Sequence, residues 1–178
     1  MSTPVEIIEY DERYPRVFAA IRKTLASVLP RHADIEHVGS TAVPGLGGKL
    51  IIDILVTAER PYVGTVVNML EALGYTFDPK VSTMRDKPFL YGTCQQEGWT
   101  FRVHVHVTHC GSKHRREMLL LRNYMRAHPD EAERYFGLKR EWAKKVGADR
   151  GKYTRLKTTY IGSVVAKAAE ETDHGSGL

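Results

Sequence analysis

One acidic side chain stands inside an unusually apolar predicted strand. Residues 50–57 read Leu-Ile-Ile-Asp-Ile-Leu-Val-Thr, and Asp53 is the only charged residue among them. A buried carboxylate costs free energy unless it is paired, hydrogen-bonded or bound to a metal ion. Asp53 therefore indicates either a functional site or a structural ion pair with a nearby Lys or Arg, and both interpretations stay open on the residues alone.

A glycine-rich segment comes directly before this strand. Gly39, Ser40 and Thr41 follow a short predicted strand over 34–38, and further glycines lead to Lys49. A Gly-Ser turn at the end of a strand exposes backbone N–H groups and a hydroxyl, which are the donors that a phosphate group needs. These residues are candidates for binding a phosphorylated substrate, and the alternative is a purely structural loop.

Two histidines alternate with valines further along the chain, in the run Arg-Val-His-Val-His-Val over 102–107. Alternate residues of a strand face the same way, so His104 and His106 share one face. Together with Asp53 they form a candidate metal set, for Mg²⁺ or, because imidazole is the softer ligand, for a transition metal. The alternative is that both histidines line a solvated sheet face.

Basic residues gather in the last third of the chain. The whole chain of 178 residues carries a net charge of +5. This balance favours anionic partners such as nucleotides, phosphorylated metabolites or RNA. Arg122 and Lys157 are candidates for lining a phosphate pocket, and Lys139 would join them around it if the C-terminal helices pack against the open face of the sheet. The alternative is that these cations extend past tyrosines that belong to the core.

The hydrophobic periodicity predicts an α+β domain over residues 1–169 and a flexible tail over 170–178. The predicted strands span 34–38, 50–57, 89–93 and 99–108. The predicted helices span 11–29, 61–73 and 113–127, and two more follow, one from Pro129 and one after 147–151.

Composition excludes several classes of protein. Hydrophobic residues make up 42% and charged residues 26%, as in ordinary globular domains. No apolar segment is long enough to span a membrane, and the N-terminus has no signal-peptide pattern. With only Cys94 and Cys110, no disulfide framework is expected, and we expect a cytoplasmic protein without a membrane partner.

The order of a Gly-Ser turn and then a strand acid resembles the nucleotidyltransferase superfamily. Residues 36–56, 103–107, 121–143 and 153–161 are, in addition, similar to motifs of the GrpB-like family, a branch of that fold. The resemblance implies a mixed sheet with an N-terminal helix and a C-terminal helical cap. It also implies that Gly39 and Ser40 hold a nucleotide phosphate and that Asp53 binds a divalent metal. Leu55 stands where the superfamily has a second acid.

We therefore expect a protein that binds a nucleotide or phosphorylated metabolite in a basic cleft. If it is an enzyme, the expected reaction is metal-dependent nucleotidyl transfer with Asp53 as the catalytic carboxylate. Three alternatives remain: an inactive nucleotide-sensing module, an RNA-binding protein, and a metal-dependent hydrolase centred on Asp53, His104 and His106.

Overall fold

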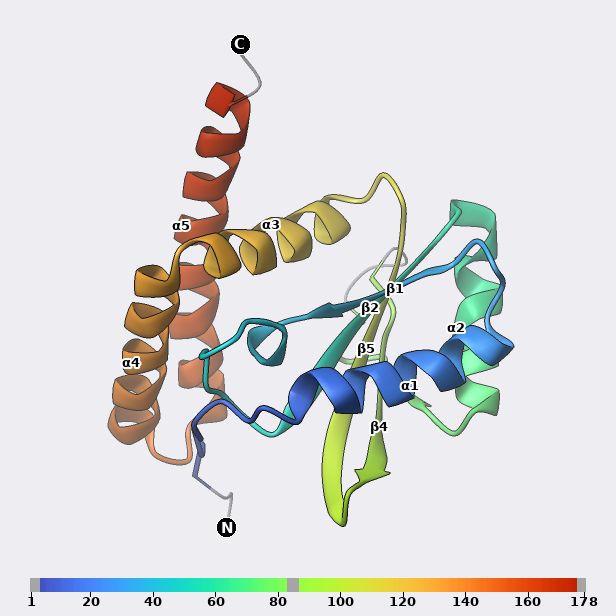
Figure 1. The fold of residues 1–178 in the computed structure, drawn as a ribbon, viewed down its shortest axis with the longest axis horizontal. Coiled ribbons are helices and arrows are strands. Elements are labelled where there is room, and N and C mark those ends of the chain that lie inside the picture. Colours follow the sequence, from blue (N-terminus) through green and yellow to red (C-terminus); the bar gives the residue numbers. More distant parts are fainter. Residues whose placement is uncertain (1–3, 83–86, 176–178) are drawn as a thin grey trace.

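A computed structural model describes residues 4–82 and 87–175, with side chains as far as residue 172 (Figure 1). The elements follow in the order α1 (Tyr14–Val28), β1 (Asp34–Val38), η1 (Ser40–Ala42), β2 (Ile51–Ala58), η2 (Arg60–Tyr62), α2 (Val63–Ala72), β3 (Thr76–Phe77), β4 (Phe89–Gln96), β5 (Trp99–His109), α3 (Lys113–Ala127), α4 (Pro129–Val146) and α5 (Arg150–Gly175). No helix in these ranges is both long enough and apolar enough to cross a membrane.

The five strands form one mixed sheet in the order β1-β2-β5-β4-β3. β2 and β5 run parallel, and every other neighbouring pair is antiparallel. β2 and β5 are therefore adjacent interior strands. The strand that carries Asp53 thus lies beside the strand that carries His104. The α+β class with a mixed sheet is confirmed.

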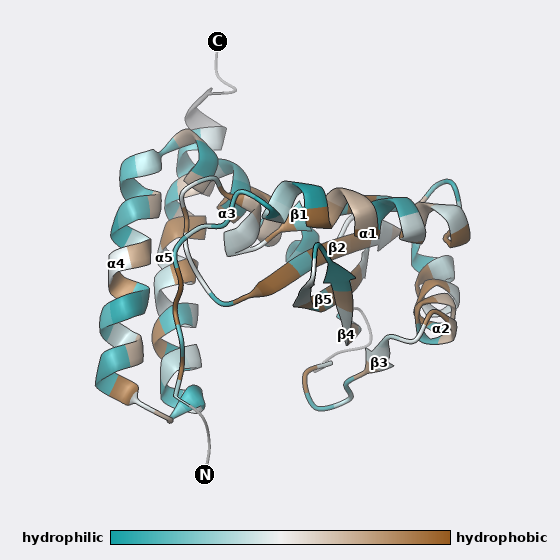
Figure 2. Cartoon of the chain, turned by 60° about the horizontal axis from the view of Figure 1, so that its bottom comes forward, coloured by the Kyte–Doolittle hydropathy of each residue, from teal (hydrophilic) through white to brown (hydrophobic). Residues whose placement is uncertain are grey.

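The sheet has one apolar face and one polar face, because its strands alternate. Ile52, Ile54 and Val56 of β2 and the valines of β5 are buried against α1 and α2. α1 contributes apolar residues at helical spacing to the same core. In Figure 2 hydrophobic segments mark β2 and the inner sides of the helices. The opposite face carries Asp53, His104 and His106, and we call it the polar face.

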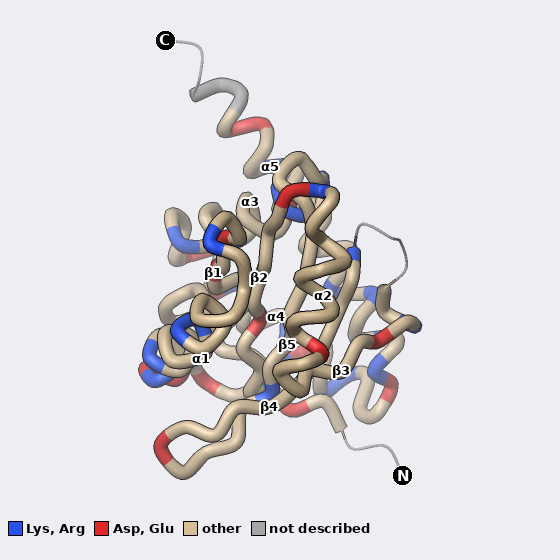
Figure 3. Tube along the Cα trace, turned by 90° about the vertical axis from the view of Figure 1, so that its right-hand side faces the viewer, with Lys and Arg blue, Asp and Glu red and all other residues tan. Residues whose placement is uncertain are grey.

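Helices α3, α4 and α5, together called the helical cap, form a second core on the other side of the sheet (Figure 1). Val43 and Leu46, from the segment 39–48 between β1 and β2, are buried in it. We call this segment the glycine loop. Because it packs into the helical cap, the loop is fixed between the cap and the polar face. Most charged positions lie on helices and turns rather than in the strands (Figure 3).

The predicted elements are found with small differences at their ends. β1 and α3 have the predicted bounds. The sequence did not predict η1 or β3, each only two or three residues long. α5 continues to Gly175, so the predicted tail from residue 170 is helical over its first part, and residues 176–178 lie outside the described residues.

Candidate functional site

Asp53 lies on the polar face, against the two predicted histidines. Its Cα is paired in register with that of His104 on β5, and His106 lies two residues further along the same strand. The carboxylate Oδ1 is 3.3 Å from His104 Nδ1 and 3.7 Å from His106 Nε2, and the Asp53 side chain is 24% exposed. The predicted convergence of these three side chains is thus found, and the reason is strand alternation across two parallel strands.

These contacts determine the charge of Asp53. Burial alone would raise the pKa of the carboxyl group, but the close approach of the His104 and His106 imidazoles outweighs burial and holds the pKa below its usual value. Asp53 is therefore a carboxylate at neutral pH. The cap side of the sheet thus presents a fixed negative charge that can bind a cation or orient a polar substrate.

The glycine loop touches this carboxylate directly. Gly39 has a φ angle of +72°, and a Cβ atom placed on it would lie 2.4 Å from Asp53 Oδ2. Both the backbone angle and the lack of space require glycine there. Ser40 follows at the start of η1, and its hydroxyl Oγ lies 3.1 Å from the Lys139 ammonium. Gly39 therefore lies beside Asp53, and Ser40 follows it in the glycine loop and contacts Lys139.

Lys139 is the most unusual cation of the site. It extends from α4, is only 2% exposed, and donates hydrogen bonds to Ser40 Oγ and to the carbonyl of Gly47. Burial, and then the charge of Lys157, lower its pKa from 10.5 to about 7, while Asp53 opposes the change. Lys139 was expected among the cations around the pocket, and its contact with Ser40 agrees with that expectation, whereas its burial was not predicted.

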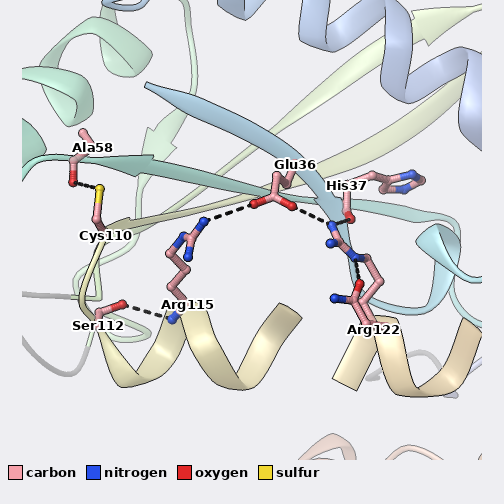
Figure 4. Close-up of polar contacts among 8 residues, drawn as sticks. Glu36, His37, Ala58, Cys110, Ser112, Arg115 and Arg122 are labelled. Atoms are coloured by element: carbon pink, nitrogen blue, oxygen red, sulfur yellow. Dashed lines mark hydrogen bonds and ion pairs between the residues drawn. The ribbon is translucent and has the colours of Figure 1, made fainter. Parts of the chain in front are cut away.

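Arg122 and Lys157 line a small pocket with Gly39 and Ser40, of about 40 Å³. Arg122 is not free to turn toward a ligand, because its guanidinium donates to Glu36 Oε2 at 2.9 Å and to the His37 carbonyl at 3.0 Å. Figure 4 shows Glu36 lying between this arginine and Arg115. Lys157, by contrast, forms no ion pair with any acid in the described part of the chain.

Lys49 lies in a neighbouring, larger groove of about 830 Å³, which Arg102, His104 and Arg150 also line. Its ammonium is 4.9 Å from the centre of the Tyr153 ring. Burial lowers the pKa of Lys49, and the nearby charges of Lys157, Arg150 and Arg102 lower it further. The predicted grouping of Lys49 with the Ser40 pocket is therefore only partly found, because Lys49 lines the adjoining groove.

The Thr41 side chain has a structural role. Its buried hydroxyl donates to the Ile51 carbonyl at 3.2 Å and lies 2.9 Å from His37 Nε2. Burial lowers the pKa of His37 to about 4, so this imidazole is neutral at pH 7. The Thr41 side chain consequently links β1, η1 and β2, and its predicted contact with a substrate stays a prediction.

Positive charge exceeds negative charge around the two cavities, although Glu6 and Asp11 also line the larger one. Arg122 and Arg13 are paired with Glu36 and Asp11. The other basic side chains near the site form no ion pair with an Asp or Glu of residues 4–82 and 87–175: Lys49, Arg102, Lys139, Arg150 and Lys157. Unpaired cations that meet in a cleft favour an anionic ligand.

Leu55, which stands where the resemblance to the nucleotidyltransferase superfamily implies a second acid, is fully buried. Leu55 is on the polar face, in register with Glu36 and His106. Within the described ranges, no group of three or more His, Cys, Asp or Glu side chains is arranged to hold a metal ion. Metal binding at Asp53, His104 and His106 therefore stays a prediction from sequence.

The comparisons with known proteins agree with this architecture. The family model described as GrpB protein matches residues 4–167. A UPF0157 protein of Pseudomonas aeruginosa is 35% identical over 175 residues, covering 96% of this chain and 70% of that protein. Another, from Halalkalibacterium halodurans, is 31% identical over 166 residues, covering 92% and 82%.

Among solved structures, the conserved protein GrpB from Enterococcus faecalis superposes with a TM-score of 0.78 at 26% identity, covering 94% of this chain and 99% of that one. Cid1 in complex with its short product ApU superposes with a TM-score of 0.53 at 20% identity, covering 77% of this chain but only 43% of Cid1. The second likeness shows a nucleotidyltransferase-like fold and no more. The matches to GrpB sequence and structure together show that this chain belongs to the GrpB family.

Proposed function

We propose that this protein binds a nucleotide, or a similar phosphorylated metabolite, between the polar face of the sheet and the helical cap. The observation that carries the proposal is Lys139, a buried cation whose hydrogen bonds go to neutral oxygens of Ser40 and Gly47. Burying an ammonium group costs free energy when no anion is in contact with it, and the charge of Asp53 offsets this cost only in part. A bound phosphate would supply that anion.

Each part of the site has a role in this proposal. The Ser40 hydroxyl would hold a phosphate oxygen, and Lys139 and Lys157 would balance the phosphate charge. Lys49 and Arg102 extend the positive field along the adjoining groove, whose volume of about 830 Å³ is of the size that small-molecule ligands occupy. The nucleotidyltransferase-like fold supports the choice of a nucleotide over other anions.

Asp53 would act through its contacts with the two histidines. If a divalent ion accompanies the nucleotide, Asp53 is the carboxylate that would hold it, and such an ion supplies charge neutralisation for phosphoryl chemistry. Without an ion, the His104 and His106 rings, which Asp53 orients, would face the ligand.

Leu55 favours nucleotide binding without turnover as a second candidate function. Its side chain is a hydrocarbon with no donor atom, so it contributes no ligand to a two-metal clamp. A labelled nucleoside triphosphate, incubated with the protein and Mg²⁺ or Mn²⁺, separates the two functions. Transfer of the nucleotidyl group would support catalysis, and binding without transfer would support sensing.

Isothermal titration tests the proposal itself. The wild-type protein is titrated with a nucleoside triphosphate and with inorganic triphosphate at pH 6.5, beside Lys139→Met and a control, Lys145→Met, at an exposed position of the same helix. We expect Lys139→Met to weaken both ligands by about 10- to 150-fold, the range for a hydrogen bond to a charged group, and the control to have no effect. Equal affinities in all three proteins would refute the proposal.

A further inference from the structure

Tyr91 of β4 stands out on the polar face because of its register. It is paired with His104 of β5, which is itself paired with Asp53 of β2. Side chains opposite one another in neighbouring strands share a face, so the three form one row across the sheet. The row begins at Asp53, which the glycine loop contacts, and ends at Tyr91, whose side chain is exposed.

The Tyr91 ring is 45% exposed and has no aromatic, cationic or hydrogen-bonding partner within the described ranges. An isolated exposed aromatic is ordinary on a protein surface. Tyr62 is exposed to a similar extent, 44%, but it lies on η2 and packs against the His32 ring. Tyr91 differs because it lies two strands from the candidate phosphate site, on the same face.

On the same face of β4, Tyr91 lies between Phe89, which packs against the His104 and His106 rings, and a polar, positively charged segment. Thr93 follows it on the same face of β4, paired with Arg102 of β5. Arg102 is exposed, and its charge reaches Lys49 closely enough to help lower the pKa of that lysine. A ligand that carries both a flat ring and phosphate groups would therefore meet an aromatic surface at one end and cations at the other.

We propose that the ligand is a nucleotide that lies across the strands, with its base stacked on the Tyr91 ring and its phosphate at Ser40 and Lys139. This inference rests on the proposed function and names its substrate class. Two strand spacings separate Tyr91 from Asp53, about 10 Å in all. An extended nucleotide covers that distance, whereas inorganic phosphate or a small sugar phosphate bound at Ser40 would not reach the ring. Because every base has an aromatic face, Tyr91 alone would not select among bases.

Paired titrations test the inference. A nucleoside triphosphate and inorganic triphosphate are each titrated into the wild-type protein, Tyr91→Ala, Tyr91→Phe and the control Tyr62→Ala. We expect the wild-type protein to bind the nucleotide about 5- to 150-fold more tightly than triphosphate, which is the contribution of one stacked base. Tyr91→Ala should remove this difference and leave the affinity for triphosphate unchanged. Tyr91→Phe and Tyr62→Ala should keep it.

The outcomes separate this inference from the proposed function. Tight triphosphate binding with no gain from the nucleoside, or a gain that Tyr91→Ala does not remove, would overturn the role of Tyr91 and leave the phosphate site intact. A loss of both affinities in Tyr91→Ala would show that the tyrosine is structural. If neither ligand binds the wild-type protein, the proposed function fails and the inference fails with it.

Discussion

Replacing Lys139 by methionine should make the protein more stable below neutral pH while it weakens ligand binding. The pKa of Lys139 is lowered from 10.5 to about 7, chiefly by burial. Between these values the unfolded chain binds a proton at this position that the folded chain does not hold. The free energy of unfolding of the wild-type protein therefore rises with pH across this window, through this group, by about 4–5 kcal/mol.

Methionine removes the charge and keeps an unbranched side chain of similar length. It also leaves the oxygens of Gly47 and Ser40 without this donor, at a cost of about 1–3 kcal/mol. At pH 6 the two effects together predict that Lys139→Met is more stable than wild type by about 1–4 kcal/mol. At pH 10.5, where Lys139 is neutral in the folded protein and half protonated in the unfolded chain, nearly all of the charge penalty is gone and the variant should be less stable by about 1–3 kcal/mol.

Urea denaturation of both proteins at pH 6 and pH 10.5 measures this reversal. Comparing the two proteins at each pH cancels the contribution of tyrosine titration to the free energy of unfolding, because the same tyrosines titrate in both. Lys145→Met, at an exposed position of α4, should change the free energy of unfolding by less than about 0.5 kcal/mol at either pH. If Lys139→Met is less stable than wild type at pH 6, the burial penalty inferred for Lys139 is wrong, because other groups of the free protein then already stabilise the buried ammonium.

Three further predictions follow from the site. Gly39→Ala should cost about 2–4 kcal/mol in thermal denaturation, because it combines a positive φ with a clash against Asp53, whereas Gly45→Ala, with φ of +76° but nothing within 4 Å, should cost only about 1 kcal/mol. Asp53→Asn should keep the fold and abolish any Mg²⁺ dependence of nucleotide affinity, measured by titration with and without the ion; an unchanged dependence would place the ion elsewhere. Glu36→Gln should cost about 1–3 kcal/mol, because it leaves the largely buried Arg122 without its carboxylate, and urea denaturation that finds no loss would contradict the importance of that ion pair.

Strand alternation made much of the fold and the centre of the site predictable. The apolar run around Asp53 and the Val-His-Val-His pattern each assign one face of a strand, and a mixed sheet brings the two polar positions together. β3 was missed because Thr76 and Phe77 are too few residues to show an alternation. The short helix η1 was missed because the glycine loop has no periodicity to read.

The electrostatic partners were not predictable, because they depend on contacts between distant parts of the chain. Lys139 was expected near the pocket as one of several cations, but only its contact with Gly47, 92 residues earlier, shows that it is buried. Arg122 was expected to face a ligand, but Glu36, 86 residues earlier, binds its guanidinium. Local sequence contains neither of these pairings.

A crystal structure of the protein with a non-hydrolysable nucleoside triphosphate at pH 6.5 would show where the phosphate binds. We expect electron density for a phosphate group between the glycine loop and the helical cap, with its oxygens within hydrogen-bonding distance of Ser40 Oγ and Lys139 Nζ. An ordered nucleotide bound at any other surface, with Lys139 still bonded only to Ser40 and Gly47, would contradict this expectation.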